Sequence, residues 1–394
     1  MTVLTLPSAE PVSSGEFQIP DLGRIGRVER RHETLRELLA HSSFDGLLLT
    51  DPANLAWLTA GSRLQLHGQG EQQPAVFLTP EARLLVCTSS ESGQLFDREI
   101  NGLGFQLKER PWEEPRHVLL DDLTRGRRVA CDHGRPGCGD VARELLAIRG
   151  TLDEDDAAAL RTVGAETAQA VEATCRTFER GQSEAEIAGQ LTHRLLRHGL
   201  QPTRIQVLAD AQGHRYRHWS FGPDPVERSL VLSVTARRDG LHASCGRTVT
   251  FGEPSQTIRD AHQVACLVQA TGLYFTRPGL SAEDVWPKVA RIYEKFGAAD
   301  EWREAPQAAV TGYAPREYEF TPRAGFRLHE GMAVHWHPSV RTAMVGDTMV
   351  CRQGRVEVVT AGDHWPQLPV VVKGTTLPRP GILVRDEATE WAVG

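Results

Sequence analysis

The stretch LVLSVTARRDGLHASCGRTVTFG, residues 230–252, decides the fold. Two runs rich in apolar and β-branched residues flank Asp239-Gly240, and this dipeptide is a strong signal for the tight turn of a β-hairpin. Because side chains alternate along a strand, His242 and Ser244 lie on the same face of the second strand. The stretch therefore predicts an antiparallel strand pair that presents polar groups on one face.

Helical segments surround this hairpin. Residues 153–180 indicate a long helix, because acidic residues gather at its start and Gly181 suits its C-terminal end. Ser183 and Glu186 form a capping-box pattern for the next helix. Further helices are expected at 258–275 and 281–296, and further strands at 204–208 and from 327 onward. We therefore expect residues 151–394 to form an α+β domain with four helices around a largely antiparallel sheet.

The residues before this domain divide into two parts. Residues 1–24 are rich in Ser, Pro and Glu and show little periodicity, so we expect a loose N-terminal arm. From residue 25 to 150 strand-like and helical segments alternate, as where the apolar run 46–49 is followed by the helix start Asp51-Pro52. This alternation predicts a small α/β domain over residues 25–150.

Composition argues against several classes of function. The chain has 394 residues and a formal net charge of −7, which disfavours nucleic-acid binding because that needs a basic face. Its seven cysteines are odd in number and show no zinc-knuckle spacing, so we expect a reduced, cytoplasmic protein. There is no secretory-signal pattern at the start and no apolar run near the ~20 residues that cross a bilayer. We therefore expect neither membrane nor nucleic acid as a partner.

Histidines are the most distinctive polar residues near the hairpin. His218 precedes it, and His335 and His337 share one face of a later strand that Pro338 ends. An imidazole with a pKa near ~6.5 accepts and gives a proton near neutral pH. This makes His218, His335 and His337 candidates for proton transfer or for contact with a ligand. No glycine-rich loop with a phosphate-binding pattern is present, so nucleotide binding has no support.

Several motifs of this domain resemble those of one known family. Residues 230–252, with Arg247-Thr248, are similar to the signature hairpin of the creatinase and Xaa-Pro dipeptidase family, whose fold is called pita-bread. Thr311-Gly312-Tyr313, Gly331-Met332 with His337-Pro338, and Asp347-Thr348 are similar to its later motifs. The metal-dependent members carry two aspartates, a histidine and two glutamates as metal ligands. The matching positions in this chain are Ser233, Ser244, Tyr313, His337 and Gly346.

The resemblance implies a C-terminal pita-bread domain, a creatinase-like N-terminal domain and a homodimer. The five changed positions argue against the paired metal ions of the family, because two close divalent cations need carboxylates to offset their charge. A single transition metal held by His242 with His335 or His337 would lack a carboxylate or cysteine partner by spacing. We therefore expect a metal-free, divergent branch of the family that uses no cofactor.

The resemblance also suggests roles for individual residues. Creatinase works without metal and cleaves a C–N bond with a histidine that precedes the signature hairpin, and His218 matches that place by order and approximate spacing. Tyr216-Arg217-His218 is similar to a metal-free subgroup, although Glu304-Ala305-Pro306 stands where that subgroup tends to have histidines. We expect His218, His337 and Tyr313 to be catalytic. The expected substrate-binding residues are Arg63, Ser233, Ser244, Arg316, Glu317 and His335.

Four hypotheses for the function follow. The first is a metal-independent hydrolase of an amide or amidine-like C–N bond in a small, polar, amino-acid-derived substrate. The second uses the same histidine for an elimination or isomerisation in specialised biosynthesis. The third is a non-catalytic pseudopeptidase that serves as a binding or scaffold protein. The fourth, a surviving metallopeptidase, is the least favoured because the expected ligand positions carry no carboxylate.

Overall fold

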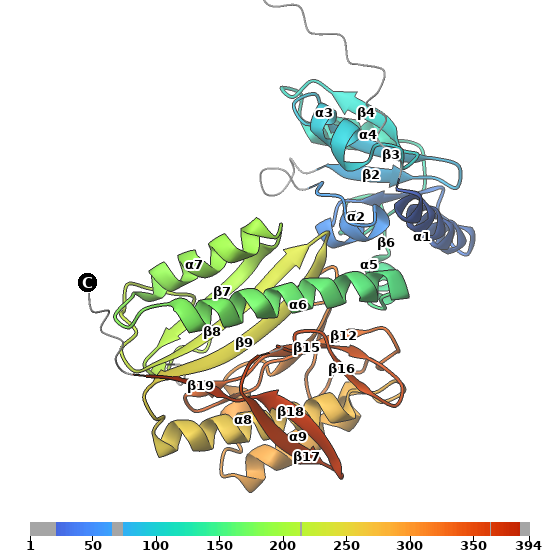
Figure 1. Ribbon diagram of the computed structural model, residues 1–394. Coiled ribbons are helices and arrows are strands. Elements are labelled where there is room, and N and C mark those ends of the chain that lie inside the picture. The colour runs from blue at the N-terminus through green and yellow to red at the C-terminus, as the bar shows by residue number, and fades with distance from the viewer. Residues whose placement is uncertain (1–20, 65–73, 213–214, 363, 387–394) are drawn as a thin grey trace, which may run out of the picture.

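Figure 1 shows the computed structural model of the chain, which describes residues 21–64, 74–212, 215–362 and 364–386. A smaller N-terminal domain lies above a larger C-terminal one. The smaller domain contains a six-stranded sheet in the order β4-β3-β2-β1-β5-β6. Its strands are β1 (Gly46–Leu49), β2 (Ala75–Leu78), β3 (Arg83–Thr88), β4 (Gln106–Arg110), β5 (Val129–Cys131) and β6 (Gly139–Asp140).

The helices of this domain are α1 (Leu22–Ala40), α2 (Pro52–Leu58), α3 (Ser92–Gln94), α4 (Arg116–Thr124) and α5 (Ala142–Arg149), with a π-helical turn at Leu95–Glu99. Asp51 caps α2 as the sequence predicts, since its side chain accepts a hydrogen bond from the Ala53 amide. The first helix begins at Leu22, inside the segment predicted as a loose arm. Asp21 caps it, and the guanidinium of Arg24 donates to the Thr59 carbonyl, which ties this end to the domain. The rest of the predicted arm, residues 1–20, lies outside the described residues.

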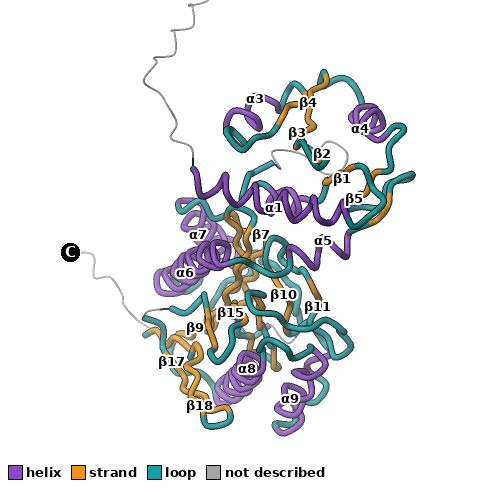
Figure 2. The backbone as a smooth tube through the Cα atoms, turned by 90° about the vertical axis from the view of Figure 1, so that its right-hand side faces the viewer, coloured by secondary structure: helices purple, strands orange, loops and turns teal. Residues whose placement is uncertain are grey.

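The C-terminal domain is built from two sheets with helices outside them (Figures 1 and 2). The first sheet has the order β19-β9-β8-β7, and the second has the order β11-β10-β12-β15-β16. Helices α6 (Glu154–Thr177) and α7 (Glu184–Arg197) cover the first sheet. Helices α8 (Gln256–Phe275) and α9 (Ala282–Lys295) lie on the far side of the second. The four helices match the sequence prediction.

The strands of this domain are β7 (Gln201–Ala209), β8 (Ser229–Arg238), β9 (Leu241–Phe251), β10 (Ala308–Thr311), β11 (Tyr318–Glu319), β12 (Ala333–Trp336), β13 (Ser339–Val340), β14 (Ala343–Met344), β15 (Asp347–Cys351), β16 (Val356–Val358), β17 (Gln367–Val372), β18 (Thr375–Pro380) and β19 (Ile382–Arg385). A short 3-10 helix, η4 (Glu301–Arg303), follows α9. Strands β13–β14 and β17–β18 form two-stranded sheets of their own.

The predicted hairpin is confirmed as β8–β9, two long paired strands in the middle of the domain. Asp239 and Gly240 form its turn with φ angles of 51° and 84°, the left-handed geometry that a two-residue turn requires. The register pairs Ser233 with Gly246 and Thr235 with Ser244. Because Gly246 also bridges to Gly346, the hairpin joins the two sheets at the position of the site described below.

Candidate functional site

A cavity of about 520 Å³ lies between the two sheets of the C-terminal domain. We call it the central cavity, and it is lined by side chains from β7, β8, β9, β12 and the segment between β10 and β11. They include Arg204, Ser233, Ser244, Arg316, His335 and His337. Five of these six are site residues predicted from the sequence, so the fold brings together residues that lie more than 100 positions apart.

Two stacked imidazoles lie at one wall of the central cavity. The rings of His335 and His337 are 4.6 Å apart between centroids and inclined by 12°. Burial lowers the pKa of His335 to about 3 and lowers the pKa of His337 well below its ordinary value, so both rings are neutral near pH 7. His337 Nδ1 is buried and has no hydrogen-bond partner among the described residues. A neutral imidazole with an unsatisfied nitrogen is suited to hydrogen-bond a ligand.

His218 lies beside this pair on the segment between β7 and β8. A narrow cavity of about 30 Å³ is lined by both His218 and His337. The backbone on either side of His218 is held by Gln206, whose Nε2 donates to the carbonyls of Arg217 and Trp219 at 3.1 Å each. The ring itself is exposed to solvent. These two hydrogen bonds therefore hold the backbone on either side of His218 and leave the residue accessible.

Positive charge surrounds His218. Its Nδ1 lies 3.3 Å from a guanidinium nitrogen of Arg204. Partial desolvation, and then the charges of Arg204 and Arg316, lower the pKa of His218 below 6.5. Burial and then the charge of Arg316, which lines the same cavity, also lower the pKa of Arg204. His218 is therefore the free base near neutral pH, as a general base must be.

Among the described residues that line the central and the narrow cavity, none is an aspartate or a glutamate. Two arginines without a carboxylate partner inside the cavity make it favourable for an anion. Arg316 pairs with Glu319 at 3.0 Å, but both side chains are largely exposed, so solvent screens this pair. The electrostatics favour a ligand that carries a carboxylate or a comparable anionic group.

The positions that match the metal ligands of the family hold different chemistry. The Oγ atoms of Ser244 and Thr235 lie 2.8 Å apart, and Ser233 lies one pleat further along the strand. Gly346 offers no side chain, and a Cβ built there would come within 3.2 Å of the Gly246 amide nitrogen and of His335 Cε1. Among the described residues, no group of three or more His, Cys, Asp or Glu side chains is placed to hold a metal ion. This donor set does not fit two divalent cations.

Tyr313, predicted as catalytic, lies elsewhere. Its side chain is buried between the two domains, and its hydroxyl donates to Asp156 Oδ1 at 2.7 Å. Arg31 of the N-terminal domain pairs with the same carboxylate at 2.7 Å. Burial and the nearby Asp156 raise the pKa of Tyr313. The phenol therefore belongs to a domain contact, because the segment after β10 turns it away from the central cavity.

Glu317 is also directed to the domain contact. It is buried and pairs with Arg149 at 2.6 Å, and its Oε1 accepts a hydrogen bond from the Ala314 amide. Its neighbour Arg316 points the other way and lines the central cavity. Of these two adjacent residues, Arg316 alone lines the central cavity, so a contact with a substrate in that cavity stays a prediction for Arg316 and is geometrically excluded for Glu317.

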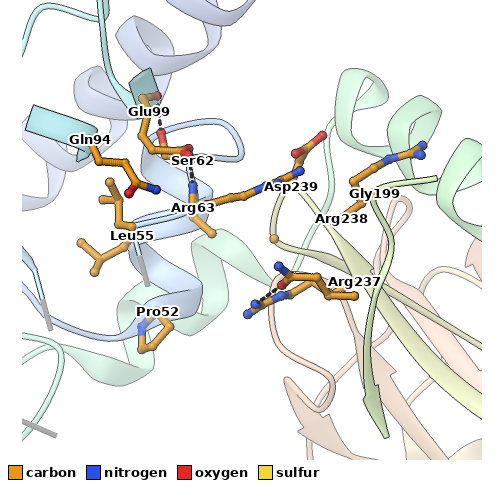
Figure 3. A pocket seen from close by; sticks show the side chains of 14 residues that line it. Pro52, Leu55, Ser62, Arg63, Gln94, Glu99, Gly199, Arg237, Arg238 and Asp239 are labelled. Atoms are coloured by element: carbon orange, nitrogen blue, oxygen red, sulfur yellow. Dashed lines mark hydrogen bonds between the residues drawn. The ribbon is translucent and has the colours of Figure 1, made fainter. Parts of the chain in front are cut away.

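Arg63 lines a separate pocket of about 380 Å³ between the N-terminal domain and the β8–β9 turn (Figure 3). Arg237, Arg238 and Asp239 lie on the hairpin side of this pocket, and Arg237 donates to Gln201 Oε1 at 2.7 Å. His218, His335 and His337 do not line it. Within one chain, Arg63 is therefore separate from the central cavity.

Arg204 and Gln206 are site residues that the sequence analysis missed. Both lie on β7, where Arg204 pairs with Thr235 and Gln206 with Ser233. Their polar side chains alternate with apolar neighbours, so the period of two along residues 203–208 would have placed them on one face. The missing information was which strand lies next to Ser233, and that neighbour is fixed by the fold.

The chain resembles known peptidases over most of its length. The Xaa-Pro dipeptidase of Lactobacillus helveticus is 23% identical over 358 residues, which cover 85% of this chain and 90% of that protein. Among solved structures, the prolidase from Pyrococcus horikoshii OT3 matches with a TM-score of 0.74 and 14% identity, covering 85% of this chain and 99% of that one. The dipeptidase PepE from Mycobacterium ulcerans matches with a TM-score of 0.74 and 17% identity over 92% of this chain and 99% of that one.

These similarities confirm the expected pita-bread fold, preceded by the smaller N-terminal domain. Residues 158–367, more than half of the chain and the part that holds the central cavity, match metallopeptidase family M24. The chain therefore belongs to metallopeptidase family M24.

Proposed function

We propose that this protein is a metal-independent hydrolase that cleaves an amide or amidine-like C–N bond in a small, amino-acid-derived, anionic substrate. The observation that carries the proposal is the lining of the central cavity and of the narrow cavity beside His218. Where the family places carboxylates, this chain has Ser233, Ser244 and His337, and Arg204 and Arg316 add positive charge. Such a lining disfavours paired cations and favours an anionic substrate.

The substrate carboxylate would bind between Arg204 and Arg316, which places the adjacent amide next to His218. The neutral His218 imidazole takes a proton from water as the water oxygen bonds to the amide carbon. It then gives that proton to the nitrogen as the C–N bond breaks. One proton is taken and one is returned, so a single histidine completes the cycle without a metal.

The neighbouring groups would orient the substrate. The unsatisfied Nδ1 of buried His337 and the hydroxyls of Ser233 and Ser244 offer hydrogen bonds inside the central cavity. These groups act in a partly desolvated space, where a hydrogen bond to developing charge counts for more than it does in water. The same histidine placed against a carbon acid would instead run an elimination or isomerisation. The two reactions differ in whether oxygen from water enters the product.

The proposal also includes a reduced cytoplasmic setting and a homodimer. Among the described residues, which include all seven cysteines, there is no disulfide bond, and six of the cysteines are buried, which agrees with a reducing compartment. Among the described helices, none is long and apolar enough to span a lipid bilayer. Light scattering of the purified protein measures the oligomeric state directly.

The test combines chelation with substitution of His218. Protein dialysed against a chelator and assayed with a panel of N-acyl and amidino amino acids should release the free amine, with ¹⁸O from labelled water in the acid product. His218→Ala should lower kcat by roughly 10²–10⁴-fold, the usual contribution of a general base. His193→Ala, at an exposed position on α7, is the matched control and should keep full activity.

Two results would contradict the proposal. The first is activity that the chelator abolishes and that stoichiometric metal restores, with the metal found by elemental analysis. The second is undiminished turnover in His218→Ala. Ligand binding without turnover across the whole panel would favour the non-catalytic binding protein.

A further inference from the structure

A second large pocket lies on the other side of His218. It has a volume of about 490 Å³, and His218 and Arg316 line both this pocket and the narrow cavity that holds His337. The candidate base therefore lies between two compartments rather than at the end of one. A substrate that spans both would place its middle portion beside His218.

The walls of this second pocket are aromatic. Trp286 of α9 and Trp302 of η4 meet edge to face, with ring centroids 5.4 Å apart and planes inclined by 74°. Phe320, Pro306 and Pro322 add further apolar surface. We call this the tryptophan pocket. Its lining contrasts with the arginines, histidines and serines of the central cavity, so the two compartments suit chemically different parts of a ligand.

Two further observations indicate a ligand. Trp286 is 5% exposed, and its buried indole Nε1 has no hydrogen-bond partner among the described residues. Buried indole N–H groups are normally paired, so this unpaired donor is an unusual feature of the pocket wall. Glu304 and Glu319 also line the tryptophan pocket and offset the charges of Arg303 and Arg316 there, so this pocket lacks the excess positive charge of the central cavity. The anionic end of a substrate is thus directed to the side of Arg204 and the apolar end to the tryptophans.

We propose that the tryptophan pocket binds an aromatic group on the acyl side of the scissile bond, so that the substrate is an amino acid whose nitrogen carries an aromatic acyl group. This inference rests on the proposed function for the position of the amide. The ring would contact the edges and faces of Trp286 and Trp302, where offset and edge-to-face contacts are favourable. The pocket volume lies within the range of small-molecule sites.

The experiment measures binding, by calorimetry on chelator-treated protein, of N-benzoylglycine and of N-acetylglycine. Both probes carry the same carboxylate and amide and differ in the acyl group. Wild-type protein should bind N-benzoylglycine at least tenfold more tightly. Trp302→Ala should remove most of that preference and leave N-acetylglycine binding unchanged, while Trp302→Phe should keep most of it. Trp112→Ala, at a tryptophan of the N-terminal domain that is 70% exposed, is the control and should change neither affinity.

Equal affinities of the wild-type protein for the two probes would overturn the inference, and so would failure of N-benzoylglycine to bind at millimolar concentration. An equal loss of affinity for both probes in Trp302→Ala would also overturn it, because a general disturbance of the site would then be the cause. Selective binding without hydrolysis would contradict the proposed function alone. The two proposals therefore fail in distinguishable ways.

Discussion

The protonation state of His218 is the residue-scale property on which the proposed reaction depends. Partial desolvation and the charges of Arg204 and Arg316 lower its pKa, so the free base persists to a lower pH than for an isolated histidine. We predict that the acidic limb of kcat/KM has its midpoint below pH 6.5. Arg204→Gln should move the midpoint upward, toward 6.5, because it removes a nearby positive charge. Arg204→Lys should move it less.

The pH–rate profile and an NMR titration of His218 without substrate measure the same shift independently. The NMR titration separates the charge effect from any loss of substrate affinity, since Arg204 is also a proposed carboxylate ligand. A midpoint that does not change in Arg204→Gln would show that partial desolvation alone sets the pKa.

At the residue scale, the sequence predicted the strand residues of the site better than the loop residues. Ser233, Ser244 and His335 reach the central cavity because strand periodicity decides which face each occupies, and His337, one residue beyond β12, lies on the same side as His335. Tyr313 and Glu317 lie in the segment between β10 and β11, where no period applies. Their direction is set by Asp156 and Arg149 of distant segments, and these partners are visible only in the folded chain.

At the β8–β9 turn, both the backbone geometry and the contact between the domains restrict which residue fits at position 240. Gly240 has a φ of 84°, and a Cβ there would lie 2.6 Å from the Ala56 Cβ of α2 and 2.8 Å from the Tyr313 ring. We predict that Gly240→Ala destabilises the protein by both backbone strain and steric conflict. The strain alone costs about 1–2 kcal/mol, and overpacking adds about 1–3 kcal/mol.

Gly279→Ala is the matched control for this prediction. Gly279 has a similar φ of 89°, but nothing lies within 4 Å of a Cβ built there, so the substitution reports the strain alone. Urea unfolding of both variants gives the difference, which is the packing cost at the contact of α2, the hairpin and Tyr313. Equal destabilisation of the two variants would mean that α2 shifts to make room for the added methyl group at no cost in free energy. The packing at this contact would then be loose.

At the element scale, helices and the central hairpin were predictable, whereas the order of the strands was not. The capping box at Ser183 and the turn at Asp239-Gly240 are local signals, and both are present in the structure. The order β11-β10-β12-β15-β16 depends on contacts between segments far apart in sequence. Residues 21–24 were wrongly placed in the arm, because the contact of Arg24 with the Thr59 carbonyl that holds α1 is itself long-range.

At the scale of the whole molecule, a buried network of two arginines and two carboxylates lies next to the central cavity but does not line it. Arg247 and Arg379 both pair with Asp347, at 3.0 and 3.1 Å, next to Gly346. Glu172 of α6 also pairs with Arg247, at 3.2 Å. All four side chains are buried. These charges are satisfied by one another, so the carboxylates of this network are not free to face the central cavity.

Acid sensitivity is a property of the whole molecule that follows from its buried neutral histidines. Burial lowers the pKa of His242 to about 4, of His262 to about 4 and of His335 to about 3. The unfolded chain, with histidine pKa values near ~6.5, then binds more protons than the folded chain between roughly pH 6.5 and 4. Stability is therefore fully present above pH 6.5 and falls as the pH decreases through this window. Each histidine contributes a slope of up to about 1.4 kcal/mol per pH unit.

Urea unfolding at intervals between pH 7 and 4.5 measures this slope. We predict that His262→Gln reduces it by about one histidine's share, or about 1.4 kcal/mol per pH unit. Glutamine retains a donor for the Pro380 carbonyl, which His262 Nε2 contacts at 2.9 Å, but it does not titrate. Because His335 faces the central cavity, an anionic ligand that favours its charged form should also flatten the slope, which links acid stability to occupation of the site. A free energy of unfolding that stays constant from pH 6.5 to 4.5 would contradict this assignment and would mean that water reaches these imidazoles in the folded state.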